Sequence, residues 1–459
     1  MKNVSLSLFF LLIVTIILPI FTLFDITTYF AFIFMSILVR LVLVFLTPKN
    51  HSVLINNFLN LAQGIYLIIV LIMWSHAHND YGVFDMSKLT GDSFGYFSEA
   101  LMMHDQRGKS FLELRELSRV NYFLFQYILS KVIFLFKSEY LSSLMFVVFT
   151  GLLNLLLLFK IGVLLNFKKQ IIKTIGVFYI IFPHILASNT VLLKDSLLLF
   201  SFLLIIYSAL CINIQNNNNF FKLSIYSILS LFLCFFIRLP FTILFILCFY
   251  YLATKNYSKL RNIIIFSLFT SFILSNYFLI QFDKITLSAS QLQRALIDGE
   301  VYGSGLTNLL VGSYATDPFY LKIIKLPLVV FVQYTHPMNI FTFSHSNPWE
   351  YININMKIIW LVFFGPIFLF SFFQRKFLQP LLKRLLIISV TGYVLIAYLE
   401  TGLVPRYALL FMCLSILPLA YIFQEIKTNL LLKRKFMFFK RIYFYLFIFL
   451  SFSYIIYKL

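Results

Sequence analysis

The sequence predicts an all-α fold: a polytopic transmembrane helical bundle of about 13 spans, forming a single integral membrane domain over residues 1–459. Apolar residues make up 61% of the chain and charged residues only 12%, whereas soluble domains carry about 25% charge. Apolar runs of about 20 residues recur from end to end, and each can cross the ~30 Å hydrocarbon core as a helix. A transmembrane β-barrel would instead show alternating segments of about ten residues.

The first predicted span follows Lys2 directly. We interpret it as a retained span and not as a cleaved signal peptide, because its apolar run is long and no small-residue cleavage site follows cleanly. The other spans are assigned by the same criterion of a long apolar run bounded by polar residues. The predicted spans are 5–24, 27–47, 53–75, 140–166, 171–191, 196–213, 220–237, 241–254, 263–281, 355–373, 385–399, 407–424 and 442–457.

The loop charges predict the orientation of the chain. With the N-terminus inside, nearly every cluster of Lys and Arg falls on the cytoplasmic side, as the positive-inside rule requires. Of the 17 Asp and Glu residues, only Glu425 falls in a cytoplasmic loop. This distribution also accounts for the net charge of +20, so we expect no nucleic-acid partner. The functional face is expected to be extracytoplasmic.

Two long outer regions, 76–139 and 282–354, interrupt the spans. Ordered loops of such length are usually functional. Each contains an apolar stretch, 121–137 in the first and 326–343 in the second. Counting either stretch alone as a span would place the following basic clusters on the wrong side. We therefore interpret both as interfacial or re-entrant helices on the outer face, with two ordinary spans as the alternative.

The first outer region is rich in acids: seven of the 17 lie between Asp80 and Glu116. Within it, "GDSFGYFSEA" predicts an amphipathic helix with Asp92 at the N-cap position. Tyr96 follows four residues later on the same helical face. Asp92 is either a simple helix cap or a functional carboxylate at the membrane surface. The apolar residues that define the helical period are Phe94, Phe97, Leu101 and Met102.

Further charges stand at the predicted outer ends of spans. Lys194 and Asp195 occupy a tight turn between two spans, where charge is costly and usually paired or functional. Arg238 begins the sequence Arg-Leu-Pro between two spans, and Glu400 and Arg406 flank the last outer turn. Each is explained either by interfacial ion pairing and snorkelling or by binding of a phosphate.

Two other patterns carry weaker expectations. Pro183 and His184 should kink the span that contains them and could open a cavity. The stretch "SHAHNDYGVFD" places His76, His78 and Asp80 close together, an arrangement that could bind zinc. Loop clusters this short more often bind no metal, so we assign no metal ligand.

The order of these elements resembles the GT-C class of membrane glycosyltransferases, which use polyprenyl-phosphate-linked sugars, and the related Wzy-type polymerases of O-antigen or capsule repeat units. The resemblance rests on an acid with a downstream Tyr in a long outer loop, a Pro-containing span ending in Lys-Asp, a hairpin at Arg-Leu-Pro and a late outer Pro-Arg-Tyr. It covers about 85–260, and 355–424 more loosely. In much of that class the acidic loop follows the first span, whereas here it follows the third. Either two spans were added at the front, or Asp92 is not the equivalent residue.

The resemblance implies glycosyl transfer from an undecaprenyl phosphate- or diphosphate-linked sugar or oligosaccharide at the outer face of a bacterial inner (cytoplasmic) membrane. Asp92 would be the general base on the acceptor hydroxyl or a metal ligand. Asp195 would help to position a sugar, a phosphate or a divalent ion. The cofactor stays open, with a divalent metal ion as the candidate. The implied substrate- and phosphate-binding residues are Tyr96, Lys194, Arg238, Glu400 and Arg406.

The expected partners are a lipid-linked oligosaccharide, membrane lipid and other membrane proteins of polysaccharide assembly. We favour a polymerase, because the second outer region is long enough to hold a growing glycan. A single-sugar transferase is the first alternative. A transporter or flippase is the second, but it should show repeats and several mid-span charges; no repeat is visible, and Arg40 and Lys173 are the main mid-span candidates. A structural protein without chemistry would need neither long outer region.

Overall fold

The structure is a computed structural model that describes residues 2–23, 26–78, 91–106, 124–136, 139–215, 220–253, 360–399 and 409–458, with a few short segments between 84 and 114. Helix accounts for 89% of it, and the described residues include no strand. The predicted all-α class is therefore confirmed for this part of the chain. The five described helices that are long and apolar enough to cross a membrane, which indicate a membrane-embedded protein, contain Ile26–Leu46, Ser52–His76, Tyr140–Leu164, Asp195–Ile214 and Leu409–Thr428.

The chain divides into two compact units, Met1–Phe245 and Ile246–Leu459. Each unit is described by itself. The predicted span 263–281 and the second outer region 282–354, with its apolar stretch 326–343, lie outside the described residues. The predictions of 13 spans and of a single integral domain stay predictions.

The first unit opens with three helical segments that match the first three predicted spans. Helix α1 (Lys2–Leu12) continues through a π-helical turn, η1 (Ile13–Ile17), into a 3-10 turn, η2 (Leu18–Phe21). Pro19 lies in this last turn, where its missing N–H ends the regular hydrogen-bond ladder. Helices α2 (Ile26–Leu46) and α3 (Ser52–His76) follow.

Arg40, which the sequence marks as a mid-span charge, lies near the turn between α2 and α3. Its Nη2 donates a hydrogen bond to Asn56 Oδ1 at 2.8 Å, and the Thr47 hydroxyl approaches the same oxygen at 3.4 Å. The guanidinium is therefore held to α3 only a few residues from the turn. Arg40 therefore lies toward the end of α2 that leads into α3 and not at the middle of its span.

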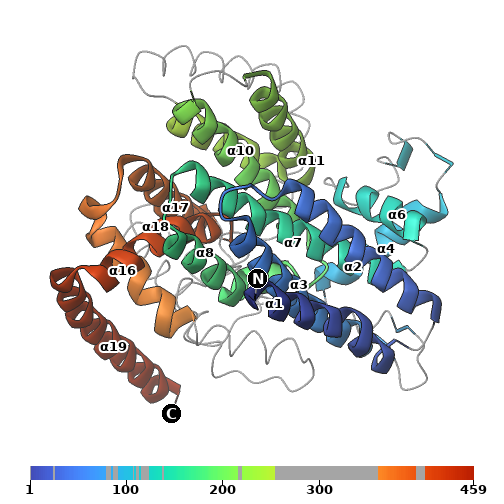
Figure 1. The fold of residues 1–459 in the computed structure, drawn as a ribbon, viewed down its shortest axis with the longest axis horizontal. Helices are drawn as coiled ribbons and strands as arrows, with labels where there is room; N and C mark the ends of the chain where they lie inside the picture. Colours follow the sequence, from blue (N-terminus) through green and yellow to red (C-terminus); the bar gives the residue numbers. More distant parts are fainter. Residues whose placement is uncertain are drawn as a thin grey trace. The chain divides into compact units, whose positions relative to one another are not determined.

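Helix α7 (Glu139–Leu164) is the centre of this unit. It packs against α2, α3 and α10, and also against α6 (Leu124–Phe136), the described part of the stretch predicted to be interfacial (Figure 1). Helix α6 has 13 residues, which corresponds to about 20 Å of helix, less than the ~30 Å hydrocarbon core. Residues 121–123 and 137 of the predicted stretch lie outside the described part, so the choice between an interfacial helix and an ordinary span stays a prediction.

The fifth predicted span is broken, as the proline predicted. Helix α8 (Lys169–Ile181) ends at Phe182, whose backbone is extended (φ −77°, ψ 116°), and α9 (Pro183–Ser188) begins at the next residue. A proline clashes sterically with an α-helical conformation of the residue before it, so Phe182 cannot continue α8. Helix α10 (Asp195–Gln215) follows after a turn formed by residues 189–194, called the α9–α10 turn below.

Helix α11 (Phe220–Ala253) has a break at Arg238, where the backbone is extended (φ −162°, ψ 84°). Neighbouring residues of α10 contact both sides of this break. The Ser201 hydroxyl donates to Ser230 O at 2.7 Å, and the Phe202 ring lies 5.0 Å from the Phe245 ring. In a straight helix Ser230 and Phe245 would be about 22 Å apart. Helix α11 therefore folds back on itself at Arg238, as the Arg-Leu-Pro sequence predicted.

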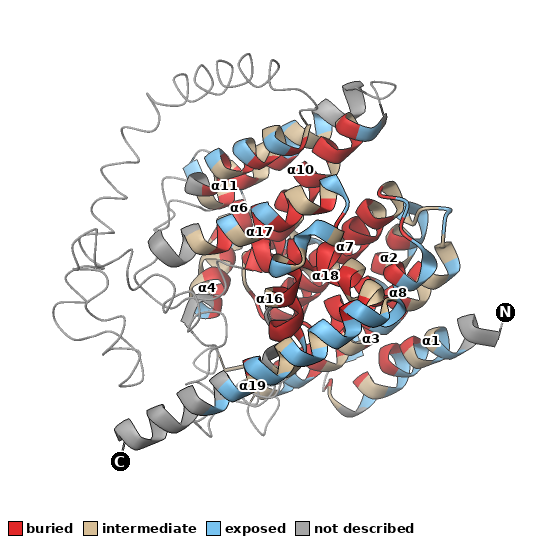
Figure 2. Ribbon diagram, turned by 90° about the vertical axis from the view of Figure 1, so that its left-hand side faces the viewer, coloured by how far each residue is buried: buried red, intermediate tan, exposed pale blue. Residues whose placement is uncertain are grey.

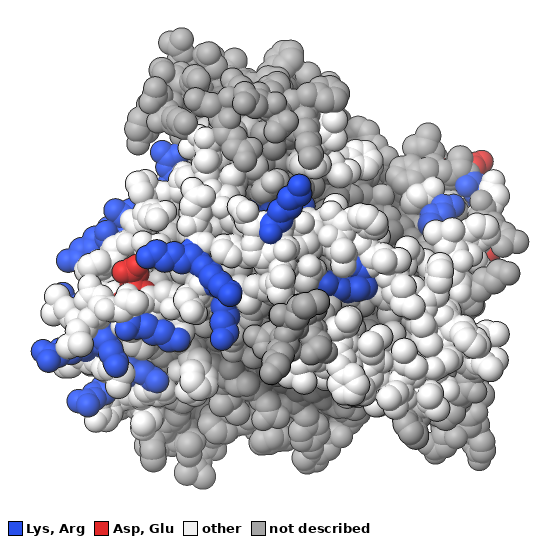
Figure 3. All heavy atoms as spheres, viewed as in Figure 1, with Lys and Arg blue, Asp and Glu red and all other residues white. Residues whose placement is uncertain are grey.

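The second unit is built around α18 (Leu409–Thr428), which is buried along most of its length (Figure 2). It packs against α16 (Gly365–Phe373), α17 (Pro380–Leu399) and α19 (Leu430–Lys458). A π-helical turn, η5 (Trp360–Phe364), precedes α16, and a 3-10 turn, η6 (Arg375–Phe377), follows it. Basic side chains gather over the exposed surface of α19 (Figure 3).

Candidate functional site

Aromatic side chains seat α4 (Gly91–Asp105) on the ends of α3 and α7. The Phe84 ring lies 5.6 Å from the Phe97 ring of α4 and 5.3 Å from the Tyr140 ring of α7. Phe84 also reaches the His78 ring at 5.5 Å, and His78 stacks on Trp74 of α3 at 3.7 Å. The C-terminal end of α3, the N-terminal end of α7 and the first half of α4 therefore meet in one aromatic cluster.

The predicted helix in "GDSFGYFSEA" is confirmed, but it begins at Gly91, so Asp92 lies inside its first turn and not at the predicted N-cap position, and its predicted apolar face is wrong in part. Phe94 is 44% exposed, whereas Phe97 is fully buried. The buried face combines large and small residues. Its small residues allow the backbone of α4 to come close to α6 and α7, on which it packs. The buried residues of α4 are Ser93, Tyr96, Phe97, Ala100 and Met103.

The first turn of α4 is fastened to the α9–α10 turn. The Ser93 hydroxyl, which is buried, donates to Leu192 O at 3.3 Å. One helical turn later, Lys194 Nζ lies 5.6 Å from the centroid of the Tyr96 ring, within the range of a cation–π interaction. The structure thus brings Tyr96 and Lys194 together, two residues that the sequence assigned separately to substrate binding. It also places the backbone of Asp92, the residue before Ser93, beside this turn.

A buried hydrogen-bond network holds the α9–α10 turn from the other side. Asn189 is fully buried, and its Nδ2 donates to the Tyr179 hydroxyl at 3.0 Å and to the Tyr66 hydroxyl at 3.2 Å. Tyr179 in turn donates to Gly151 O at 2.7 Å. The network joins α3, α7 and α8 to the start of the turn. Gly151 has no room for a side chain, because an added Cβ would clash with Asn189.

The start of α10 is tied to α7 by a second set of bonds. The hydroxyls of Thr150 and Ser196 lie 2.8 Å apart, and Asn154 Nδ2 donates to Ser196 O at 2.9 Å. Asp195, the first residue of α10, is only 4% exposed. A carboxylate at this position is favoured by the positive end of the helix dipole. The predicted site residue Asp195 is therefore held in a fixed, nearly enclosed position beside Lys194.

Arg238 lies at the same level of the bundle as Asp195. Ser230 of α11 contacts Ser201 of α10. Arg238 is eight residues after Ser230, and the residue eight positions before Ser201 is Leu193 in the α9–α10 turn, so Arg238 and this turn are at similar heights along the helices. Phe202 of α10 also contacts Phe245 of α11. Asp195 and Arg238 each precede their residue of this contact by seven positions, so they too are at similar heights. Both contacts therefore place the α11 break at the same end as the α9–α10 turn. The guanidinium lies 5.2 Å from the Phe241 ring.

Some predicted site residues cannot be placed. Glu400 and Arg406 lie outside the described residues, and of Asp92 the structure describes the backbone, in the first turn of α4, but not the side chain. Asp80 of the possible zinc cluster is also outside, while His78 Nδ1 contacts Trp74 O at 2.7 Å. Within the described part of the chain, no group of three or more His, Cys, Asp or Glu could hold a metal ion.

No family model matches the chain, and neither a curated protein nor a solved structure matches it significantly. The resemblance to the GT-C class and to repeat-unit polymerases therefore stays a prediction.

The arrangement has a definite chemical character. A cation (Lys194), an aromatic ring (Tyr96) and an enclosed carboxylate (Asp195) stand together at one end of the helices. Such a set can bind a phosphate through the cation and hold a proton or hydroxyl at the carboxylate, while the buried Tyr96 ring holds the Lys194 ammonium in place. Asn189, Tyr179 and Tyr66, which fix this set in place, were not among the site residues predicted from the sequence. Asn189 within "HILASNT" was the available signal, because an amide buried in an apolar segment requires partners.

Proposed function

We propose that this protein is a membrane glycosyltransferase that acts on a polyprenyl-linked sugar or oligosaccharide at the extracytoplasmic face, polymerising the repeat units of a surface polysaccharide. The observation that carries the proposal is the attachment of the first turn of α4 to the α9–α10 turn, through Ser93 and Tyr96. This attachment gathers the acidic helix and the Lys-Asp pair, which are about 100 residues apart in the sequence. If Asp92 served only to cap α4, this contact between α4 and the α9–α10 turn would not be needed.

The charges at this end suit a reaction with a phosphate leaving group. Lys194 and Arg238 are cations, and Arg238 lies at the level of Asp195 in the bundle. Cations fixed beside a leaving phosphate stabilise the negative charge that develops on it in the transition state. Asp92, in the first turn of the same α4, is our candidate for the base that removes the proton from the acceptor hydroxyl.

The proposed reaction balances without any further reagent. The acceptor hydroxyl oxygen bonds to the anomeric carbon of the donor sugar while the bond from that carbon to the lipid phosphate oxygen breaks. The proton of the hydroxyl passes to the carboxylate, and the electron pair of the broken bond leaves with the phosphate. The products are a lengthened glycan and a free lipid phosphate or diphosphate.

The experiment that tests this function is surface-polysaccharide profiling by gel in a deletion strain. The strain is complemented with wild-type protein, with Asp92→Asn or with Arg238→Ala, and membrane protein levels are measured in parallel. Asp105→Asn is the matched control, since Asp105 is an exposed acid at the other end of α4. We expect Asp92→Asn to reduce polymer by about 10²–10⁴-fold, the usual contribution of a general base, and Asp105→Asn to behave as wild type.

The outcomes separate the competing functions. Glycan with a single repeat unit at a normal protein level supports the polymerase. A truncated repeat unit identifies a single-sugar transferase. Lipid-linked repeat units that an externally added lectin cannot reach identify a transporter. Full-length polymer from the Asp92→Asn variant would show that Asp92 has no catalytic role and only stabilises the start of α4.

A further inference from the structure

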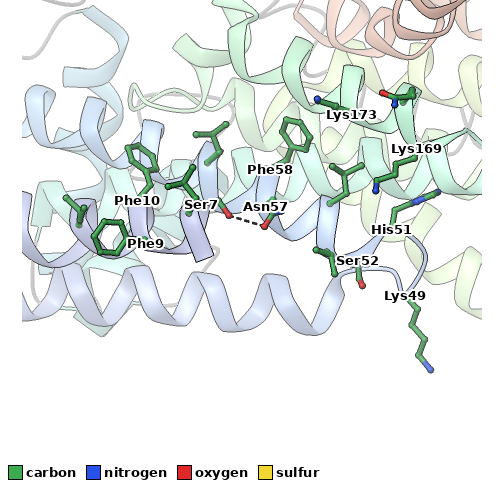
Figure 4. A pocket seen from close by; sticks show the side chains of 16 residues that line it. Ser7, Phe9, Phe10, Lys49, His51, Ser52, Asn57, Phe58, Lys169 and Lys173 are labelled. Atoms are coloured by element: carbon green, nitrogen blue, oxygen red, sulfur yellow. Dashed lines mark hydrogen bonds between the residues drawn. The ribbon is translucent and has the colours of Figure 1, made fainter. Parts of the chain in front are cut away.

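A pocket of about 1160 Å³ lies in the first unit between α1, α3 and α8. It is at the opposite ends of α3 and α8 from the α9–α10 turn, and so apart from the site described above. Its volume exceeds the roughly 300–1,000 Å³ of most small-molecule pockets. Polar and basic side chains stand at one end of it, and Phe9 and Phe10 at the other (Figure 4).

The polar end carries charge of one sign. Lys169 and Lys173 lie four residues apart on the same face of α8. Lys49 and His51 come from the turn between α2 and α3. No carboxylate is among the described side chains that line the pocket. The pocket is therefore complementary to an anion.

His51 supports this assignment through its backbone. It has a left-handed conformation (φ 60°, ψ 21°) and makes no side-chain hydrogen bond that caps α3. A positive φ is uncommon outside glycine, and such outliers concentrate at functional sites. Figure 4 shows the His51 ring next to the Lys169 side chain at the polar end of the pocket, while Lys49 extends outward.

The apolar end is an open groove with fixed walls. Leu6 and Phe9 of α1 are 75% and 60% exposed, so the groove can accept an apolar chain. Phe58 forms another wall and packs so closely on Gly176 of α8 that an added Cβ there would lie 2.6 Å from its ring. A hydrogen bond of 3.0 Å from the Ser7 hydroxyl to Asn57 Oδ1 joins α1 to α3 within the pocket lining (Figure 4).

We propose that this pocket binds one anionic phospholipid of the cytoplasmic leaflet. The headgroup phosphate contacts Lys169, Lys173 and His51, and an acyl chain lies along Phe9 and Leu6. Basic pockets between transmembrane helices on the cytoplasmic side suit anionic headgroups, and the loop charges predict that this end of α3 and α8 is cytoplasmic. Lys49, Lys169 and Lys173 are all exposed and all line the pocket beside the apolar groove, so a bound headgroup can reach them. The inference does not depend on the proposed glycosyltransferase function.

The test is native mass spectrometry of the purified full-length protein, titrated in detergent with dioleoylphosphatidylglycerol. Dioleoylphosphatidylcholine and inorganic phosphate are the comparison probes. We expect wild type to retain one phosphatidylglycerol in preference to phosphatidylcholine, with no displacement by phosphate. Lys169→Gln combined with Lys173→Gln should weaken binding about 30-fold, at about five- to sixfold per lysine. Lys433→Gln combined with Lys435→Gln, two exposed lysines of α19, is the matched control and should bind as wild type.

A second variant tests the groove without touching the charges. Leu6→Ala combined with Phe9→Ala changes only exposed side chains, so the fold is preserved. It should weaken binding of dioleoylphosphatidylglycerol but not of the short-chain dihexanoyl form. Full binding by the double-glutamine variant, equal binding of phosphatidylcholine, displacement by inorganic phosphate, or unchanged dioleoyl binding in the second variant would each overturn the proposal.

Discussion

Asn189→Ala is the substitution that most directly tests how the candidate site is built. Asn189 is fully buried and donates hydrogen bonds to the hydroxyls of Tyr66 and Tyr179. Ala removes both bonds and leaves the space of the amide empty. We expect a less stable protein in which the α9–α10 turn, and with it Lys194 and Asp195, is no longer held in one position.

The magnitude follows from the environment. A side-chain hydrogen bond between membrane helices contributes about 0.6 kcal/mol on average, so the two bonds together contribute about 1.2 kcal/mol. The cavity and the weakened packing raise the expected loss of unfolding free energy to about 2–3 kcal/mol. At about 2–4 °C per kcal/mol for a unit of this size, the apparent melting temperature should fall by roughly 4–12 °C.

The chain provides its own reporter for this measurement. All four cysteines, Cys211, Cys234, Cys248 and Cys413, are buried. A maleimide dye that fluoresces on reaction with thiols will therefore report unfolding of the detergent-purified protein. Polysaccharide profiling of the same variant reports the site, and we expect polymer to fall by more than the loss of folded protein explains.

A single-bond variant makes the reasoning refutable. Tyr66→Phe removes one acceptor of Asn189 and keeps the ring, so it should cost only about 0.6 kcal/mol. The double variant with Asn189→Ala should cost less than the two effects added, because the shared bond is counted once. An unchanged melting temperature for Asn189→Ala, or a Tyr66→Phe cost as large as that of Asn189→Ala, would refute the network as the support of the turn.

Three further predictions concern orientation and packing. Cysteines placed at the exposed residues Lys109 and Lys168 should differ in intact cells: a membrane-impermeant maleimide should label the first and not the second until the membrane is permeabilised. Ser93→Ala should lower stability by only about 0.6 kcal/mol but should reduce polymer more strongly, because α4 loses its bond to the α9–α10 turn. Gly392→Ala should cost about 1–3 kcal/mol, because the added Cβ meets an aromatic ring of α18, whereas Gly95→Ala in α4, with nothing within 4 Å, should stabilise by about 0.4–1 kcal/mol. Melting temperatures measured with the thiol dye check both glycine variants.

Contrary outcomes are equally specific. Equal labelling at Lys109 and Lys168 would place both on one side and contradict the predicted orientation. A Ser93→Ala variant with full polymer would mean that the α4 attachment is not needed for function. A stabilised Gly392→Ala would contradict the close approach of α17 and α18.

Much of the fold was predictable because each signal is local. The apolar runs predicted the helices from α1 to α3, and a proline predicted the break at Phe182. The turn at Arg238 followed from its Arg-Leu-Pro sequence. The apolar face of α4 was predicted less well, since Phe94 is exposed. Periodicity locates an amphipathic helix but does not show which of its sides meets a neighbouring helix of small and aromatic residues.

The sequence by itself determined the helical class, the apolar helices that the described part confirms and the charged residues worth testing, because long apolar runs and isolated charges have direct energetic consequences in a membrane. Only the tertiary structure decided that Tyr96 meets Lys194, that Asn189 holds the turn, and that Lys169 and His51 face one pocket. These pairs join helices that are distant in the sequence. Their meeting depends on how the helices pack, which no local pattern specifies.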